Sequence, residues 1–336
     1  MKSISWNVCG LGSLRATRRL RYFLKQQNPR MVFLMKTKID KQRIERVRRG
    51  CGFLNGIEVS ADGSRGGLCL AWKEALDVTL RSLSKNHIDV MIKEENSNLE
   101  WRFTGFYGSP YFNGKSESWN LLRKLGEDQS QPWLVKGDFN EIMYTFEKSG
   151  GVPREDKRME AFREVLEECQ LEDIGYSGVW FTWEKGNFAN NNIRKRLDRG
   201  VAIDKWRSLF PTHKIFHLPH SISDHCPLLL NTEDENTQVG NTHFKFEAWW
   251  ITEELLEKEI RDCWESKYRP NLRETEEATI KLRCSIKVKR AGLKKKLTKE
   301  LEELMAKDSD DDTIVRIIST RVDLNMEIDR DEIYWE

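Results

Sequence analysis

The stretch WLVKGDFNEI, residues 133–142, joins a short apolar run to a cluster of polar side chains. The run from Trp133 to Val135 indicates a buried β-strand, and Asp138 and Asn140 follow where that strand would end. Similar apolar runs occur at residues 4–8, 31–35, 67–72, 90–93, 103–107 and 227–230. Between several of them, apolar side chains recur at helical spacing in residues 15–27, 116–126 and 157–169. Strands that alternate with helices and outnumber them predict a mixed α/β fold of stacked sheets with helices outside.

The composition predicts a folded globular chain and argues against several other classes of protein. Of the 336 residues, 38% are hydrophobic, with 12 tryptophans and 15 phenylalanines, which suffices for one large core or two smaller ones. No apolar run approaches the roughly 18 uncharged residues of a membrane span, and the start MKSISWNVCG lacks a secretory h-region. Seven cysteines without a CxxC pair argue against a disulfide framework or a zinc ribbon. We therefore expect a nuclear or cytoplasmic protein, in a reducing compartment and without a membrane partner.

The charge distribution divides the chain. Residues 1–250 hold 38 Lys and Arg against 32 Asp and Glu, whereas residues 251–336 hold 18 against 22. The polar stretch that begins at Asn231 indicates a linker, which predicts a first domain over 1–232, a linker over 233–243 and a helical region over 244–336. Helices are expected there at 252–267, at 273–307 and from Asp310–Asp312 onward. The basic run 281–296 is either a solvated helix face or a nucleic-acid contact.

Four short clusters carry side chains that could perform chemistry, each where a predicted strand ends or begins. They are Ser5–Asn7, Gly137–Asn140, Arg196–Arg199 and Ser223–Pro227. Any one alone could be local capping, because Asx side chains bond to the backbone where strands turn. Strand ends that converge on one edge are a usual place for an active site. Together the clusters offer acids, amides and a histidine with an acid able to orient it, which suits phosphodiester hydrolysis assisted by a hard cation.

These segments resemble the endonuclease/exonuclease/phosphatase superfamily and, within it, the apurinic-type endonuclease domain of plant LINE-type (non-LTR) retrotransposon polyproteins. The matching text is SWNVCGLG at 5–12, FYGSP at 106–110, WLVKGDFNEI at 133–142, FTW at 181–183, RLDR at 196–199 and SDHCPLLL at 223–230. The resemblance implies two stacked mixed β-sheets flanked by helices, a four-layer α/β sandwich, followed by a helical C-terminal extension. FKFEAWW at 244–250 and DEIYWE at 331–336 resemble the connector before the reverse transcriptase, so the chain is expected to end ahead of that polymerase.

The resemblance also implies roles for individual residues. Asn7 and Asp224 would bind Mg²⁺ or Mn²⁺, and no small-molecule cofactor is expected. Asp138 would align or deprotonate the attacking water, and Asn140 would hold the phosphate or that water. His225 would contact the phosphate oxygen that gains charge, with its tautomer fixed by Asp198. Tyr107 would lie near the scissile phosphate as a hydrogen-bond donor or acid; the alternative is that it only packs within a strand. Cys226 is interpreted as a residue that packs within a strand.

One position departs from the family pattern in a way that bears on activity. The family's metal-binding glutamate lies in a segment of the form LxETK, and here residues 34–38 read LMKTK, which places Lys36 there. An ammonium has no lone pair for a metal, and each charge unit beside a cation is worth on the order of several kcal/mol. The sequence therefore predicts weakened metal binding and impaired cleavage. The alternative is that Lys36 contacts the phosphate directly.

A second departure concerns the substrate. Family members that recognise abasic sites carry a tryptophan where this chain has Lys195, so an abasic-site pocket is not expected. Arg194, Lys195 and Arg196 also differ from the proline-tryptophan pattern of the inositol-phosphate phosphatases and suit a polymeric phosphate backbone. The leading hypothesis is a metal-dependent DNA endonuclease that nicks a chromosomal strand to prime reverse transcription. The alternatives are an inactive nucleic-acid-binding remnant and, third, a small-molecule phosphatase.

Overall fold

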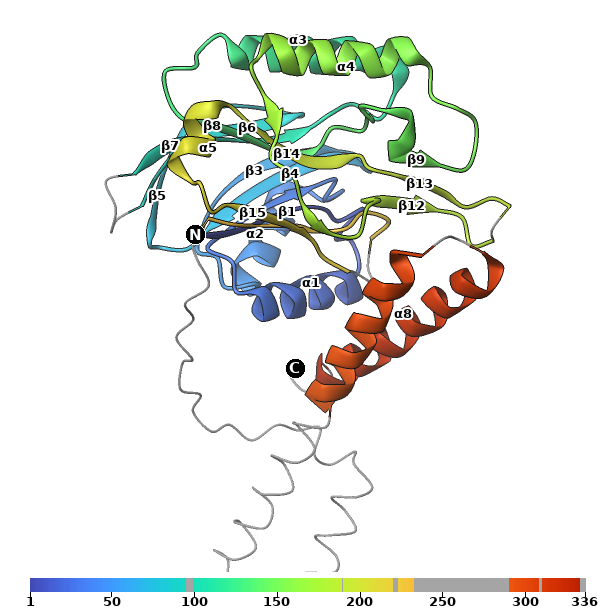
Figure 1. Cartoon of the computed structure of the whole chain (residues 1–336). Helices are drawn as coiled ribbons and strands as arrows, with labels where there is room; N and C mark the ends of the chain where they lie inside the picture. Colours follow the sequence, from blue (N-terminus) through green and yellow to red (C-terminus); the bar gives the residue numbers. More distant parts are fainter. Residues whose placement is uncertain (95–98, 189, 220–222, 233–289, 308–309, 333–336) are drawn as a thin grey trace, which may run out of the picture.

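Two β-sheets pack face to face and carry helices on their outer faces (Figure 1). The computed structural model describes residues 1–94, 99–188, 190–219, 223–232, 290–307 and 310–332. Figure 1 shows helices α3 (Lys115–Gly126) and α4 (Asp156–Glu168) over one sheet, and α1 (Leu14–Gln27) and α2 (Lys41–Gly50) against the other. The expected four-layer α/β sandwich is confirmed.

The first sheet is mixed and, in the described part of the chain, has seven strands in the order β11-β15-β16-β1-β2-β4-β3. Their bounds are β1 Lys2–Asn7, β2 Met31–Met35, β3 Asn55–Asp62, β4 Arg65–Trp72, β11 Ser177–Gly178, β15 Lys214–His217 and β16 Leu228–Asn231. Strands β1 and β2 are parallel, with Asn7 opposite Met35, whereas β1 and β16 are antiparallel. The first polar cluster and position 36 therefore leave the sheet at the same edge.

The second sheet has six strands among the described residues, in the order β10-β14-β8-β7-β6-β5. Their bounds are β5 Leu76–Ser84, β6 His87–Glu94, β7 Glu100–Tyr107, β8 Trp133–Asp138, β10 Glu172–Asp173 and β14 Asp198–Ala202. Asp138 lies opposite Asp198 on one side and Tyr107 on the other. The register therefore places three predicted site residues in one row across the sheet.

Short elements complete the fold. A small third sheet consists of β9 Lys148–Ser149, β12 Trp183–Lys185 and β13 Ile193–Lys195. The remaining helices of the described residues are α5 Asp204–Leu209, the 3₁₀ turns η1 Phe112–Gly114 and η2 Thr145–Glu147, and α8 Asp311–Glu332, while residues 290–305 are also helical. The three helices predicted before residue 170 are confirmed; α2 and α5 were not predicted. Both have short apolar patterns that charged residues interrupt.

The core follows the alternation of the strands. On β2, Phe33 faces the other sheet and packs edge-on against Phe103, whereas Val32 and Leu34 face the helices α1 and α2. A lysine side chain crosses the interior: the Lys136 amino group donates to the Ser3 carbonyl at 3.1 Å and to its hydroxyl at 2.9 Å. Burial holds the pKa of Lys136 well below its usual range. This contact ties β8 to β1, the two strands that bear the central site residues.

The described part of the C-terminal region is helical and contacts helix α1. Leu301 and Leu304 pack with Ile317 and Leu324 in a separate apolar cluster that includes the half-buried Tyr22 of α1. The Asp310 carboxylate accepts from the Thr313 backbone N–H at 2.7 Å and caps α8, which confirms the helix predicted from Asp310–Asp312. The predicted linker, the helix at 252–267 and the first part of the helix at 273–307 lie outside the described residues. Within the described chain, no helix combines the length and apolar character that a membrane crossing requires.

A buried histidine makes the stability of this fold depend on pH. His217 stacks on Tyr176 with ring centroids 4.2 Å apart, and its Nδ1–H donates to the Val179 carbonyl at 2.7 Å. Burial lowers its pKa to about 4, so the folded chain keeps a neutral imidazole while the unfolded chain binds a proton below about pH 6.5. Stability is therefore lost as the pH falls from about 6.5 towards 4. We expect this histidine to contribute about 2 kcal/mol of the loss in unfolding free energy between pH 7 and pH 5.

Urea unfolding of the parent and of His217→Phe at both pH values measures this contribution. Phenylalanine keeps a ring against Tyr176 and does not titrate, so the variant is expected to lose about 2 kcal/mol less than the parent over the same interval. An equal loss in the two proteins would show that His217 does not titrate there.

Candidate active site

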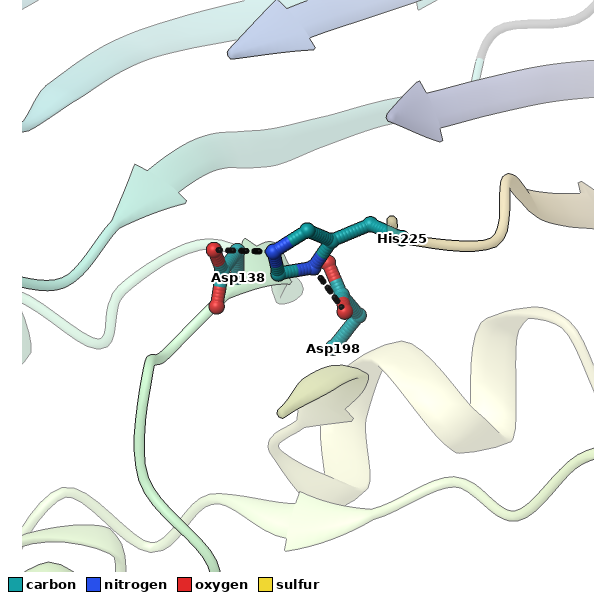
Figure 2. Close-up of side chains that lie close together, drawn as sticks. All are labelled: Asp138, Asp198 and His225. Atoms are coloured by element: carbon teal, nitrogen blue, oxygen red, sulfur yellow. Dashed lines mark hydrogen bonds and ion pairs between the residues drawn. The ribbon is translucent and has the colours of Figure 1, made fainter. Parts of the chain in front are cut away.

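Two of the predicted acids, Asp138 and Asp198, meet His225 at one edge of the two sheets (Figure 2). Asp138 ends β8, Asp198 begins β14, and His225 lies in the loop that leads into β16. The Trp6 indole on β1 donates to the His225 carbonyl at 2.8 Å, and an isolated bridge pairs His225 with Trp183. A strand of the first sheet and a strand of the small third sheet therefore fix the backbone that carries the histidine.

His225 lies between two carboxylates. Its Nδ1 is 2.8 Å from Asp198 Oδ2, and its Nε2 is 3.8 Å from Asp138 Oδ2 (Figure 2). Burial alone would lower the pKa of His225, but the charges of Asp198 and Asp138 outweigh it and raise the pKa to about 9. Burial raises the pKa of Asp198 to about 6, although the histidine opposes this. At neutral pH the site therefore holds an imidazolium that Asp198 orients and that faces Asp138.

Two asparagines hold Asp138 in place. The Asn7 and Asn140 side-chain amides both donate to Asp138 Oδ2 at 2.9 Å, and the Asn140 backbone N–H donates to Oδ1 at 2.8 Å. Asn140 adopts a left-handed φ of 55°, a conformation that asparagine tolerates better than most residues. Tyr107 is the buried neighbour of Asp138 in β7, and burial, reinforced by Asp138, raises the pKa of its phenol far above the usual range. The phenol is therefore a neutral hydrogen-bonding group.

Lys36 also lies at this edge, among acidic groups. Its backbone is left-handed, with φ 56°, directly after β2. Burial would lower the pKa of its ammonium, but Cys9, Asp224 and Asp138 outweigh burial and raise it. Asp224 also accepts a hydrogen bond from the Trp183 indole at 3.0 Å. A lysine at position 36 therefore supplies a permanent positive charge beside the acid that was predicted to bind metal.

The residues at this edge could bind a metal ion near Asp138, but they disfavour one near Asp224. Asp138, Asp198 and His225 offer ligand atoms within 4.8 Å of one another, and Asp198 Oδ1 is buried without a hydrogen-bond partner among the described residues. These atoms could hold a divalent cation, provided that His225 first loses its proton. Around Asp224 the fit is poor, because Lys36 already places an ammonium there.

Several solved structures share this architecture. An AP endonuclease from Leishmania major has a TM-score of 0.53 and 17% identity, over 68% of this chain and 86% of that one. The endonuclease domain of TRAS1, a telomere-specific non-LTR retrotransposon, has a TM-score of 0.50 and 15% identity, over 68% and 97%. A 3′ phosphatase from Neisseria bound to a product DNA hairpin has a TM-score of 0.52 and 15% identity, over 69% and 98%.

The chain has the endonuclease/exonuclease/phosphatase fold. Neither a family model nor a curated protein matches the sequence. At these identities the likeness concerns the fold alone. The chemistry of the site is therefore inferred from the arrangement of its residues in this chain.

Within this fold, the three basic residues before Asp198 have different surroundings. Arg196 is buried and binds Glu147 at 3.0 Å and Asp173 at 2.8 Å, which corrects the expectation that it contacts a nucleic acid: two carboxylates already occupy its guanidinium. Arg194 lies over the Phe181 ring and donates to the Lys307 carbonyl at 2.9 Å, in the helical C-terminal region. Lys195 is half-buried with its ammonium 4.8 Å from the Trp183 ring centroid, and burial and neighbouring cations lower its pKa to about 8.

Three residues that support the site were not predicted. The Thr182 hydroxyl accepts from the backbone N–H groups of Leu197 and Asp198 at 2.9 Å each. The Lys115 ammonium donates to the Phe139 and Asn140 carbonyls, and Cys9 affects the pKa values of Lys36 and Asp224. Thr182 and Cys9 lie within segments that carry the resemblance, so a signal was present for them. Lys115 had none, because only the packing of α3 brings it to the site.

Proposed function

We propose that this chain is an endonuclease-type phosphodiesterase domain whose substrate is DNA. The observation that carries the proposal is the position of His225, held by Asp198 through Nδ1 and presented to Asp138 through Nε2. An imidazolium in a buried site donates a hydrogen bond to a phosphate oxygen as that oxygen gains charge. The wider support is the shared fold with nucleases, one of which is bound to a DNA product.

The other residues then take complementary roles. The Asp138 carboxylate, with its orientation fixed by Asn7 and Asn140, accepts the proton of the attacking water. The neutral Tyr107 phenol donates to the phosphate. A bound Mg²⁺ or Mn²⁺ would neutralise phosphate charge. In this chain the Lys36 ammonium lies near Asp138 and Asp224, where its positive charge opposes such an ion.

The finer role that we propose is nicking of a target strand in retrotransposition. It rests on the matching segments between residues 5 and 230 and on the likeness to the TRAS1 domain. We further propose that Lys36 impairs cleavage in this copy. A nucleic-acid-binding protein without cleavage is the second candidate, and the raised pKa of Lys36 favours it, because the ammonium stays charged where a metal ligand is needed.

Removal of the histidine tests the proposal. We expect His225→Ala to reduce the nicking of supercoiled plasmid by at least about 10²-fold relative to the parent, because the donor to the developing oxyanion is lost. Formation of relaxed circles is followed with protein in excess, in Mg²⁺, in Mn²⁺ and in a chelator.

The matched control is His213→Ala, which removes a half-buried histidine that contacts the Phe210 carbonyl and lies on another loop. This variant should nick at the parental rate. Equal nicking by the parent and by His225→Ala would refute the proposed mechanism. Tight DNA binding by a parent that never nicks would support the second candidate.

A further inference from the structure

Four aromatic rings form a connected row on the surface, here called the aromatic ladder: Tyr144, Phe146, Trp180 and Tyr176. Tyr144 and Phe146 stack with centroids 5.2 Å apart and planes at 10°, Phe146 and Trp180 are 5.8 Å apart, and Trp180 and Tyr176 5.9 Å. Phe146 is 61% exposed, Tyr144 43% and Trp180 40%. Exposed apolar groups that form a contiguous patch mark an interaction surface.

The rings of the ladder are held in position by contacts with one another and with buried side chains next to them. The Trp180 indole donates to the Phe146 carbonyl at 3.3 Å. The residue after Phe146, Glu147, is buried and binds Arg199 at 2.9 Å, which anchors the turn η2. Tyr176 is fixed from below by its stack on His217. A ligand that stacks on this row therefore loses little free energy to the ordering of the rings.

Positive charges accompany the ladder. The Arg163 guanidinium lies 5.3 Å from the Tyr144 ring centroid. The Arg196 guanidinium lies 4.6 Å from that of Tyr176, but Glu147 and Asp173 already bind it. Lys195 lies on β13, which pairs with β9 directly after η2. Aromatic rings with the cations Arg163 and Lys195 close to one end match a ligand that carries both flat bases and phosphates, rather than a purely apolar partner.

The chain itself ties the ladder to the active site. Tyr144 and Phe146 follow Asn140 by four and six residues, so the span to Phe146 is at most about 20 Å. Trp180 lies two residues before Thr182, whose hydroxyl accepts from the Asp198 backbone N–H. The ladder is therefore within a few nucleotides of a phosphate bound at His225.

We propose that the aromatic ladder binds unpaired nucleobases by stacking, so that the preferred strand is single-stranded beside the phosphate at the site. The inference rests on the proposed function for its substrate class. Bases within a duplex already stack on each other, so exposed rings gain contact only with unpaired ones. Loss of one ring that stacks on a base weakens binding by roughly five- to hundredfold.

Binding of single-stranded DNA tests this assignment. A fluorescein-labelled oligothymidylate and a duplex of equal length are titrated with the parent, Phe146→Ala, Trp180→Ala and Trp180→Phe, by anisotropy in a chelator. We expect the two alanine variants to bind the oligothymidylate five- to hundredfold more weakly and the duplex within about threefold of the parent. Trp180→Phe keeps a ring and should stay near the parental affinity.

The matched control is Phe188→Ala, because Phe188 is 63% exposed, slightly more than Phe146, but lies outside the ladder. Parental affinity is expected for it, and thermal melts check that each variant is folded. Unchanged oligothymidylate binding by Phe146→Ala and Trp180→Ala would overturn the assignment. So would failure of the parent to bind the oligothymidylate, or a change in self-association in place of a change in DNA affinity.

His225→Ala separates the two proposals. Oligothymidylate binding that depends on the ladder and survives in His225→Ala, together with a parent that never nicks, would support the ladder and the second candidate, a nucleic-acid-binding protein without cleavage. Nicking that depends on His225, together with parental oligothymidylate binding by the ladder variants, would refute the ladder alone.

Discussion

Lys36→Glu is expected to raise Mg²⁺-dependent nicking of supercoiled plasmid by at least about tenfold and to tighten Mn²⁺ binding. The substitution removes an ammonium next to Asp224 and supplies two carboxylate oxygens at the same edge as Asn7. Each unit of charge beside a cation is worth on the order of several kcal/mol at an effective dielectric constant near 20. Nicking is measured by relaxed-circle formation, and metal binding by calorimetry.

Lys38→Glu is the matched control for this result. Lys38 has a left-handed φ of 55°, against 56° for Lys36, and is likewise half-buried, so the variant makes the same charge change in the same backbone conformation two residues away. It should leave nicking unchanged, while His225→Ala added to Lys36→Glu should abolish it. Strong His225-dependent nicking by the parent would instead favour a direct role for Lys36. If neither the parent nor Lys36→Glu nicks the plasmid, a substitution at another position must also prevent cleavage.

Arg199→Met is expected to lower the unfolding free energy by about 3–5 kcal/mol. The Arg199 side chain is fully buried and binds Glu147 at 2.9 Å and Asp173 at 3.2 Å. Burial alone would raise the pKa values of Glu147 and Asp173, but Arg199 and, to a smaller extent, Arg196 lower them. Both carboxylates are therefore charged in the interior. Removal of one partner from a buried ionic network leaves uncompensated charge, which is strongly destabilising.

Arg207→Met provides the comparison, because Arg207 pairs with Glu172 at the surface. Exposed ion pairs contribute less than about 1 kcal/mol, so this variant should unfold close to the parent in urea. Similar unfolding free energies for the two variants would show that Arg199 does not stabilise the interior. Because Glu147 anchors the turn next to Phe146, Arg199→Met should also weaken oligothymidylate binding.

The RLDR segment, residues 196–199, led to one prediction that the structure confirms and one that it corrects. It predicted that Asp198 orients His225, and the structure confirms this contact at 2.8 Å. It also predicted that Arg196 meets a phosphate backbone, and the structure places Arg196 against Glu147 and Asp173 instead. The two acids lie 49 and 23 positions away, and nothing in the local pattern distinguishes an arginine that binds an internal carboxylate from one that binds a phosphate.

The sequence by itself determined the class of the fold and most of the central site. Apolar runs of period two and helical spacing of apolar side chains are local signals, so they located β1, β2, β8 and the helices α1, α3 and α4. Polar residues at the ends of those strands could be predicted to converge, as Asp138, Asp198 and His225 do.

Only the tertiary structure decided the contacts between segments far apart in the chain. The register that sets Asp138 opposite Asp198, the approach of Lys36 to Asp224 and the row of rings from Tyr144 to Tyr176 all depend on how strands pair and sheets pack. Such contacts are fixed by shape and by the burial of charge over the whole core, which no local pattern encodes.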